Sequence, residues 1–219
     1  SKQMIKGGIL ADDMGLGKTF SSLLGMKAIL EFARENDIKN TTEKKLEKCF
    51  MVVAPLSLLT NWKNEVSKFF ENSPFTDVVI LNSQEDLNRF KLKKGDERKQ
   101  FLTDDGNKIE ESNIQYCLKI GKSFHEDRLD IPGRLILITY ETLRNYQFSM
   151  GRIPFSCIVV DEAQKIKNPN SLATRAAKAL SSDVNIVATG TPVENDLQAY
   201  WCLMDTANER LFGAKKDCV

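Results

Sequence analysis

The stretch that decides the fold lies near the amino terminus and reads GILADDMGLGKT, residues 8–19. Its first residues are apolar, its middle is rich in glycine, and the residues from Lys18 onward have the apolar spacing of a helix. A strand that leads through a glycine-rich loop into a helix presents backbone N–H groups and the positive end of a helix dipole to an anion. The stretch therefore predicts a phosphate-binding loop.

Short apolar runs alternate with longer amphipathic runs along the rest of the chain. The expected strands are 8–10, 49–54, 78–81, 135–138, 157–160 and 185–188, and the expected helices are 18 to about 34, 56–70, 171–180 and 197–206. Strands that are apolar throughout and separated by helices predict an α/β fold, with a mostly parallel sheet covered by helices on both faces. Ligands of such sheets bind beyond the carboxyl ends of the strands, so the residues after each run are the site candidates.

Two stretches interrupt this alternation, at about residues 35–48 and 91–134. The second is rich in Lys, Glu, Asp and Gly, and its apolar residues are sparse. We expect both stretches to be surface insertions, the second partly flexible, in a single domain that spans residues 1–219.

The composition is that of an ordinary globular domain, with 42% hydrophobic residues, 28% charged residues and a formal net charge of +1. A charge so near zero does not indicate a nucleic-acid partner, so any such contact would come from a local groove. No apolar run is long enough to span a membrane, and the five cysteines form no Cys-x-x-Cys pair. We expect an intracellular protein in a reducing compartment, cytoplasmic, nucleoid-associated or nuclear depending on the organism.

The phosphate loop departs from the common G-x-x-x-x-G-K-[ST] pattern, because Asp12 stands at the first glycine position. The physical requirements still hold, since Gly15 and Gly17 allow a tight turn. Lys18 would bring a positive charge to the β- and γ-phosphates of ATP, and the Thr19 hydroxyl is a hard oxygen ligand that Mg²⁺ accepts. The alternative is a plain glycine-rich turn with an exposed lysine.

Two acids directly follow the apolar run 157–160. Asp161 would hold Mg²⁺ through its water shell, and Glu162 would orient and deprotonate the attacking water. We expect their strand to neighbour the strand that leads into the phosphate loop. Two acids alone are also common at the start of a solvated loop, but together with Lys18 they predict a Mg–ATP site.

Five segments resemble, in order and spacing, the first-lobe motifs of the Swi/Snf-related, superfamily-two DNA-dependent ATPases. They are GGILADDMGLGKT at 7–19, VAPLSLLTNW at 53–62, ITYETL at 138–143, VDEAQ at 160–164 and ATGTPVEN at 188–195. The resemblance covers nearly the whole chain apart from the two insertions. It implies a RecA-like P-loop domain with helicase-like ATP hydrolase activity, and ATP and Mg²⁺ as cofactors.

The resemblance also implies roles for particular residues. ATP would be held by Asp13, Met14, Gly15, Leu16, Gly17, Lys18 and Thr19, with Lys18 and Glu162 catalytic and Thr19 and Asp161 on the magnesium ion. The nucleotide state would be coupled to DNA binding and lobe closure by Gln164, Thr189, Gly190 and Thr191. Because Gln164 stands where the family more often has histidine, it can form a hydrogen bond but cannot carry a proton.

Contacts with the nucleic-acid backbone are implied for two loops, through Pro55, Ser57, Thr139 and Tyr140. Ser57 and Thr139 each precede a helical pattern, so helix capping is the other interpretation of these two residues. Trp62 and Trp201 lie on amphipathic faces, which favours positions in the core over base stacking.

Two partners follow from the resemblance: double-stranded DNA, and a C-terminal RecA-like lobe of the same protein that closes over the nucleotide and supplies arginine fingers. We expect the chain to be the ATP-binding half of a DNA translocase and a fragment of a longer protein. A strand-separating superfamily-two helicase is one alternative, against which segment 54–62 argues. A nucleotide-binding module that has lost hydrolysis is another, against which the intact Lys18, Thr19, Asp161 and Glu162 argue.

Overall fold

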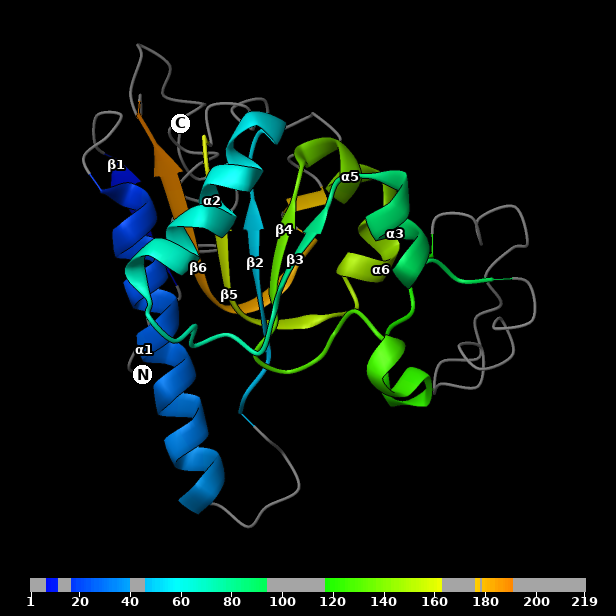
Figure 1. The fold of residues 1–219 in the computed structure, drawn as a ribbon, viewed down its shortest axis with the longest axis horizontal. Coiled ribbons are helices and arrows are strands. Elements are labelled where there is room, and N and C mark those ends of the chain that lie inside the picture. The colour runs from blue at the N-terminus through cyan, green and yellow to red at the C-terminus, as the bar shows by residue number, and fades with distance from the viewer. Residues whose placement is uncertain are drawn as a thin grey trace, which may run out of the picture.

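The structure is a computed structural model that describes residues 7–11, 17–39, 46–93, 117–162, 176–177 and 179–190. Its strands form one sheet in the order β1-β6-β5-β2-β4-β3, and all neighbouring strands are parallel (Figure 1). They are β1 Gly7–Ala11, β2 Cys49–Val53, β3 Val78–Leu81, β4 Leu135–Ile138, β5 Pro154–Val160 and β6 Ser181–Thr189. All six expected strands and the α/β class are confirmed. In the described part of the chain, no helix is both long and apolar enough to cross a membrane.

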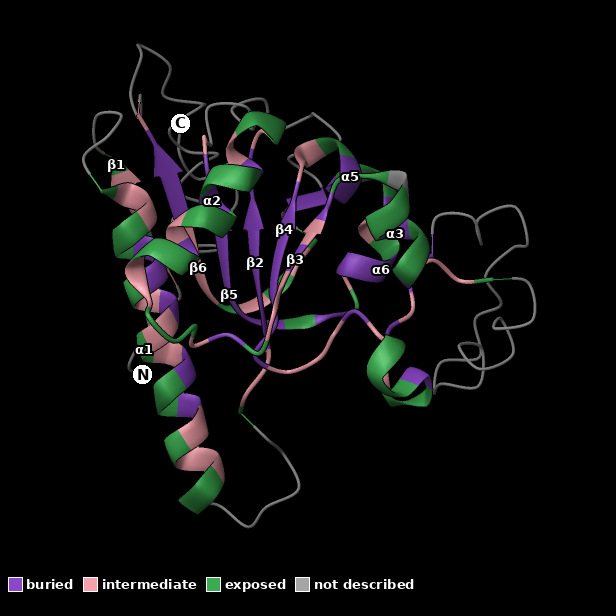
Figure 2. Cartoon of the chain, in the orientation of Figure 1, coloured by how far each residue is buried: buried purple, intermediate pink, exposed green. Residues whose placement is uncertain are grey.

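Helices cover both faces of the sheet. Phe50 and Val52 of β2 pack with residues of α1 and α2, whereas Met51 and Val53 pack on the opposite face with residues of α3, α5 and α6. The central strands are therefore buried along their length (Figure 2), which explains their continuous apolar runs. The helices are α1 Lys18–Lys39, α2 Leu56–Phe69, α3 Gln84–Phe90, α5 Tyr140–Asn145, α6 Gln147–Met150 and the 3₁₀ helix η2 Lys122–Asp127.

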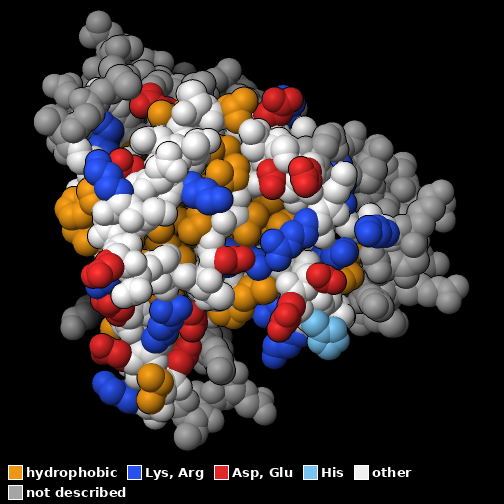
Figure 3. Space-filling view, in the orientation of Figure 1, with side chains coloured by type: hydrophobic (Ala, Val, Ile, Leu, Met, Phe, Trp, Pro, Cys, Tyr) orange, Lys and Arg blue, Asp and Glu red, His pale blue; other side chains and the backbone are white. Residues whose placement is uncertain are grey.

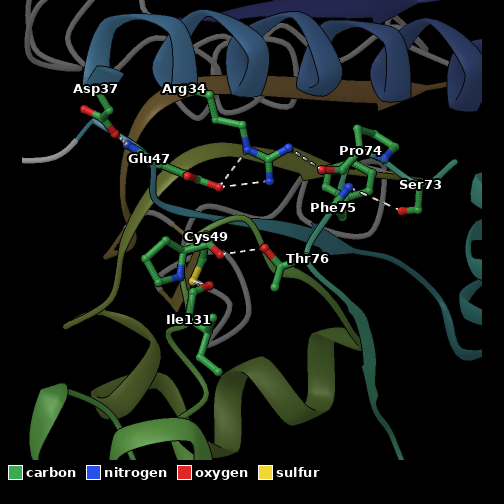
Figure 4. Close-up of polar contacts among 10 residues, drawn as sticks. Arg34, Asp37, Glu47, Cys49, Ser73, Pro74, Phe75, Thr76 and Ile131 are labelled. Atoms are coloured by element: carbon green, nitrogen blue, oxygen red, sulfur yellow. Dashed lines mark hydrogen bonds and ion pairs between the residues drawn. The ribbon is translucent and has the colours of Figure 1, made fainter. Parts of the chain in front are cut away.

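Helix α1 is longer than its apolar spacing predicts, because it ends at Lys39 rather than at about Arg34. The expected insertion at 35–48 therefore begins inside the helix. Polar contacts fix the chain where it returns to the sheet (Figure 4): the Asp37 carboxylate accepts the Glu47 N–H at 2.9 Å, and Arg34 forms an ion pair with Glu47 at 3.0 Å. Charged side chains hold the end of this helix, and these do not contribute to an apolar period.

The expected surface insertion at 91–134 is corrected at its carboxyl-terminal end. Residues 117–134 pack against the sheet, with Leu118 and Leu129 fully buried in the same core cluster as residues of α3 and α6. The apolar residues there are too widely spaced to match a helix or strand period, so the sequence pattern did not reveal the packing. Residues 94–116 lie outside the described part of the chain, as do most of 171–180 and all of 197–206.

A buried arginine ties residues 117–134 to the sheet. The Arg134 side chain is 2% exposed and pairs with Asp77, with Nε–Oδ1 and Nη2–Oδ2 distances of 2.6 and 3.1 Å. Its Nη1 donates to the carbonyls of Arg128 and Leu129 at 2.7 and 3.0 Å, and the Phe90 ring lies 5.4 Å away. Only the planar five-donor fork of arginine can satisfy all of these acceptors together.

We expect Arg134→Ala to lower the free energy of unfolding by about 3 kcal/mol, the low end of the range for breaking a buried ion pair. The low end applies because the Asp77 side chain is 38% exposed, so water can hydrate its carboxylate once the arginine is removed. Urea unfolding measures the change. Arg144→Ala removes an exposed arginine of α5 and is the matched control, expected within about 0.5 kcal/mol of wild type. Equal effects of the two changes would contradict the anchoring role.

Candidate functional site

The predicted site residues gather at one edge of the sheet. Because all strands are parallel, their carboxyl ends meet there (Figure 1), and every strand except β3 is followed by a candidate residue. Gly17 follows β1, Pro55 follows β2, Thr139 follows β4, Asp161 follows β5 and Gly190 follows β6. The structure thus brings together residues that lie far apart in the sequence.

One detail of the expected arrangement is wrong: β5 is not the neighbour of β1. Strand β6 lies between them and pairs with both, with Val187 opposite Ile9 on one side and opposite Val160 on the other. The last described strand of the chain therefore inserts between β1 and β5. Thr189, fully buried at its end, lies between the two strands that carry the phosphate loop and the acids.

A cleft of about 390 Å³ opens at this edge. Its lining includes Lys18 and Thr19 from the start of α1, and Asp161 and Glu162 from the end of β5. This volume is typical of a small-molecule site. The four side chains predicted to hold and hydrolyse Mg–ATP therefore share one cleft.

Gly17, the last residue before α1, is the part of the predicted phosphate loop that the structure describes together with the helix start. Gly17 has φ +88°, a left-handed conformation that glycine adopts without steric cost. Its carbonyl accepts the Ser21 N–H at 2.9 Å, which starts the helix at the cleft. The positive end of the helix dipole therefore faces the cleft, beside the Lys18 side chain.

Asp161 accepts one hydrogen bond on each of its two carboxylate oxygens. Asp161 is 6% exposed. Its Oδ2 accepts the Trp62 Nε1–H at 2.8 Å, and its Oδ1 accepts the Glu162 N–H at 2.9 Å. Burial raises the pKa of Asp161 above its ordinary value, and the Trp62 and Glu162 hydrogen bonds and the positive charge of Lys18 oppose the rise. A desolvated carboxylate of fixed orientation is well suited to a divalent cation.

Glu162 adopts a conformation that is uncommon for a residue with a side chain. Its φ is +52°, a backbone conformation that costs of the order of 1–3 kcal/mol and is enriched at functional sites. Successive residues of a strand point to opposite faces, so a regular continuation of β5 would separate the two acids. The left-handed turn breaks this alternation, and both Asp161 and Glu162 line the cleft.

Helix α2 supplies a wall of the cleft that the sequence analysis missed. Asn61, Glu65 and Lys68 line it, at the spacing that puts residues on one face of a helix. The polar spacing of these three residues in the sequence could have indicated that this face of α2 borders the site. Trp62 is 1% exposed, so its predicted core position is confirmed, but its hydrogen bond to Asp161 was not foreseen. A buried indole N–H needs an acceptor, and the sequence did not show which one.

The residues implied to touch nucleic acid lie at the starts of α2 and α5. Helix α2 begins directly after Pro55 without a side-chain cap, so the capping interpretation of the exposed Ser57 is wrong. Thr139 does cap α5, because its hydroxyl accepts the Thr142 N–H at 3.0 Å. Acidic and basic side chains are interspersed on the face shown in Figure 3. Nucleic-acid contacts at these positions stay predictions.

Tyr140 directs its hydroxyl into the protein, where it donates to the backbone carbonyl of Asp161 at 2.5 Å. Burial raises the pKa of Tyr140, and the negative charges of Asp161 and Glu162 raise it further. The phenol therefore keeps its proton at neutral pH and remains a donor. Other predicted residues lie outside the described part of the chain: Asp13, Met14, Gly15, Leu16, Gln164, Thr191 and Trp201.

A parallel sheet with a left-handed glycine and a lysine at its first strand–helix junction, and paired acids at a second strand end, defines a RecA-like P-loop domain. The chain belongs to the SNF2-related domain family, which matches residues 1–217.

Known proteins are similar to this chain in sequence, and one solved structure is similar to it in fold. Zorya protein ZorD of Escherichia coli is 36% identical over 215 residues, which are 98% of this chain and 17% of that protein. DNA excision repair protein ERCC-6-like 2 of Mus musculus is 32% identical, over 96% of this chain and 12% of that protein. The SWI2/SNF2 ATPase core of Sulfolobus solfataricus, solved with double-stranded DNA, matches with a TM-score of 0.58 and 27% identity, over 96% of this chain and 33% of that one. The chain thus spans a third or less of each.

Proposed function

We propose that this chain is the ATP-binding lobe of an ATP-driven double-stranded DNA translocase, which hydrolyses ATP with Mg²⁺ when joined to a C-terminal RecA-like lobe. The observation that carries the proposal is the single cleft lined by Lys18, Thr19, Asp161 and Glu162. Membership of the SNF2-related family supports it, as does the likeness to an archaeal ATPase core solved with double-stranded DNA.

The residues present fit Mg–ATP. The Thr19 hydroxyl and the Asp161 carboxylate offer the hard oxygens that Mg²⁺ prefers, and Lys18 offers a compact positive charge for phosphate oxygens. When bound, the magnesium ion would neutralise charge on the phosphates.

The roles divide between the two ends of the cleft. Lys18 and the amino end of α1 would bind the phosphates, and Asp161 would hold the metal's water shell. Glu162 would orient the attacking water and take its proton. The second lobe would exclude bulk water and add arginine donors to the phosphates.

The test is ATP turnover by a protein that carries this chain together with its second lobe, with duplex DNA, single-stranded DNA or RNA added. Stimulation by duplex DNA above the other two is the expected result. Preferential stimulation by single strands or RNA would favour a strand-separating helicase, and no turnover with any of them would favour a non-hydrolysing module.

We expect Lys18→Ala to lower kcat about 10²–10³-fold, because one preorganised donor to the developing charge is lost, and to weaken nucleotide binding as well. Steady-state ATPase kinetics and nucleotide titrations measure the two effects. Lys27→Ala is the matched control, because Lys27 lies on the same helix in a surface pair with Glu31 at 2.7 Å. Loss of activity in both variants alike would contradict the assignment.

A further inference from the structure

Trp62 brings a hydrogen-bond donor from α2 to the acid at the end of β5. It lies 99 residues from Asp161 in sequence, and its Nε1 is 2.8 Å from Oδ2 of the carboxylate. Both residues are buried, at 1% and 6% exposure, so neither can exchange this bond for water without a cost.

Tyr140 brings a second donor from α5. Its hydroxyl donates to the main-chain carbonyl of Asp161, 21 residues further along the chain. Asp161 also donates its own N–H to the Val53 carbonyl at 2.8 Å, where β2 ends. Three elements of the fold therefore fix this one residue, by its side chain, its carbonyl and its N–H.

These bonds set the direction of the carboxylate without cancelling its charge. A carboxylate offers about four lone-pair directions, and the Trp62 and Glu162 N–H groups fill one on each oxygen. About two directions remain, one on each oxygen. Indole and phenol are neutral donors, so the negative charge of the carboxylate that attracts a cation is kept. A lysine or arginine in place of Trp62 or Tyr140 would offset that charge.

We infer that Trp62 and Tyr140 are positioning residues, which hold Asp161 so that its remaining lone pairs face the water shell of Mg²⁺. The inference rests on the proposed function, because it takes Asp161 as the residue that holds the metal. It assigns to Trp62 a role beyond filling the core, and to Tyr140 a role besides the nucleic-acid contact predicted for it.

The experiment measures binding of a fluorescent non-hydrolysable ATP analogue, at increasing Mg²⁺, to a protein that carries this chain and its second lobe. Trp62→Phe keeps an aromatic ring and removes the N–H, and Tyr140→Phe removes only the hydroxyl. We expect Trp62→Phe to raise the Mg²⁺ concentration for half-maximal binding about 10- to 100-fold, and Tyr140→Phe about 2- to 10-fold. Binding in excess EDTA should be the same for both variants and wild type.

Two controls separate positioning from stability. Leu59→Ala creates a cavity beside Trp62 in the same helix and core cluster, and should lower the thermal transition while leaving the Mg²⁺ dependence unchanged. Tyr146→Phe removes the hydroxyl of another buried tyrosine at the end of α5, and should also leave the Mg²⁺ dependence unchanged.

The outcomes distinguish the two claims. If wild type binds the analogue without any Mg²⁺ dependence, the proposed function fails. If wild type depends on Mg²⁺ and the Trp62 and Tyr140 variants match it, the proposed function stands and the positioning role is refuted. A shift in Leu59→Ala as large as that in Trp62→Phe would also refute it, because general loosening of α2 would then be the cause.

Discussion

Replacing Glu162 with glutamine is expected to lower kcat for ATP hydrolysis about 10²–10⁴-fold and to leave nucleotide binding unchanged, the range that a positioned general base contributes. Glutamine has nearly the same shape and can still orient a water molecule, but its amide cannot accept the water's proton. It also keeps the backbone N–H that donates to Asp161, so the neighbouring metal-holding acid stays in place.

The measurement pairs steady-state kinetics with nucleotide titration, because the prediction separates turnover from binding. Glu71→Gln is the matched control, since Glu71 is an exposed glutamate just after α2. Turnover near the wild-type rate in Glu162→Gln would show that another group takes the proton. A loss of binding as large as the loss of turnover would show that Glu162 acts on the bound nucleotide rather than on the water.

Residues 1–219 alone are expected to hydrolyse ATP about 10³–10⁵-fold more slowly than the same lobe joined to a C-terminal RecA-like lobe, and without stimulation by DNA. An arginine finger accounts for a factor of this size in phosphoryl transfer. A second lobe would also exclude bulk water from the cleft of about 390 Å³, and without it water would weaken each electrostatic contact there.

The same 219 residues should nevertheless unfold in one cooperative thermal transition, because both faces of the sheet are covered by helices of the chain itself. Calorimetry and ATPase assays on one preparation test the two statements together. Robust DNA-dependent turnover at a rate independent of protein concentration would overturn the prediction. Turnover that rises with the square of protein concentration would instead show that a second copy of the chain takes the place of the C-terminal lobe.

The central strands were predictable because a strand buried on both faces must be apolar throughout, as β2 and β4 are. The polar first half of β6, residues 181–185, carried no such signal, so the expected strand at 185–188 is shorter than the observed one. The order of the strands was not predictable to the same degree. The residues of apolar runs such as 157–160 and 185–188 do not indicate which strand each run pairs with. The position of β6 between β1 and β5 is therefore known only from the structure. The packing of residues 117–134 was missed for a related reason, because scattered apolar residues have no period.

The candidate site was predictable where the chemistry is local in sequence. Lys18 and Thr19 follow a glycine turn, and Asp161 and Glu162 follow an apolar strand, so each pair could be assigned from its own segment. The hydrogen bond of Trp62 to Asp161 joins residues 99 positions apart, and no local pattern encodes it. The left-handed backbone of Glu162 was likewise hidden, since it follows from where its neighbours are fixed.

The place of β6 has a consequence for folding. β1 lies at the edge of the described sheet and pairs there with β6 alone. Residues 7–11 can therefore join the sheet only after residues 181–189 have formed their strand. Closing a loop of this length costs entropy before any contact repays it, and such non-local pairing is slow. During synthesis, β1 would leave the ribosome before the other five strands of the described sheet and dock after β6 has been made. An exposed early strand of this kind is an aggregation hazard until its partner arrives.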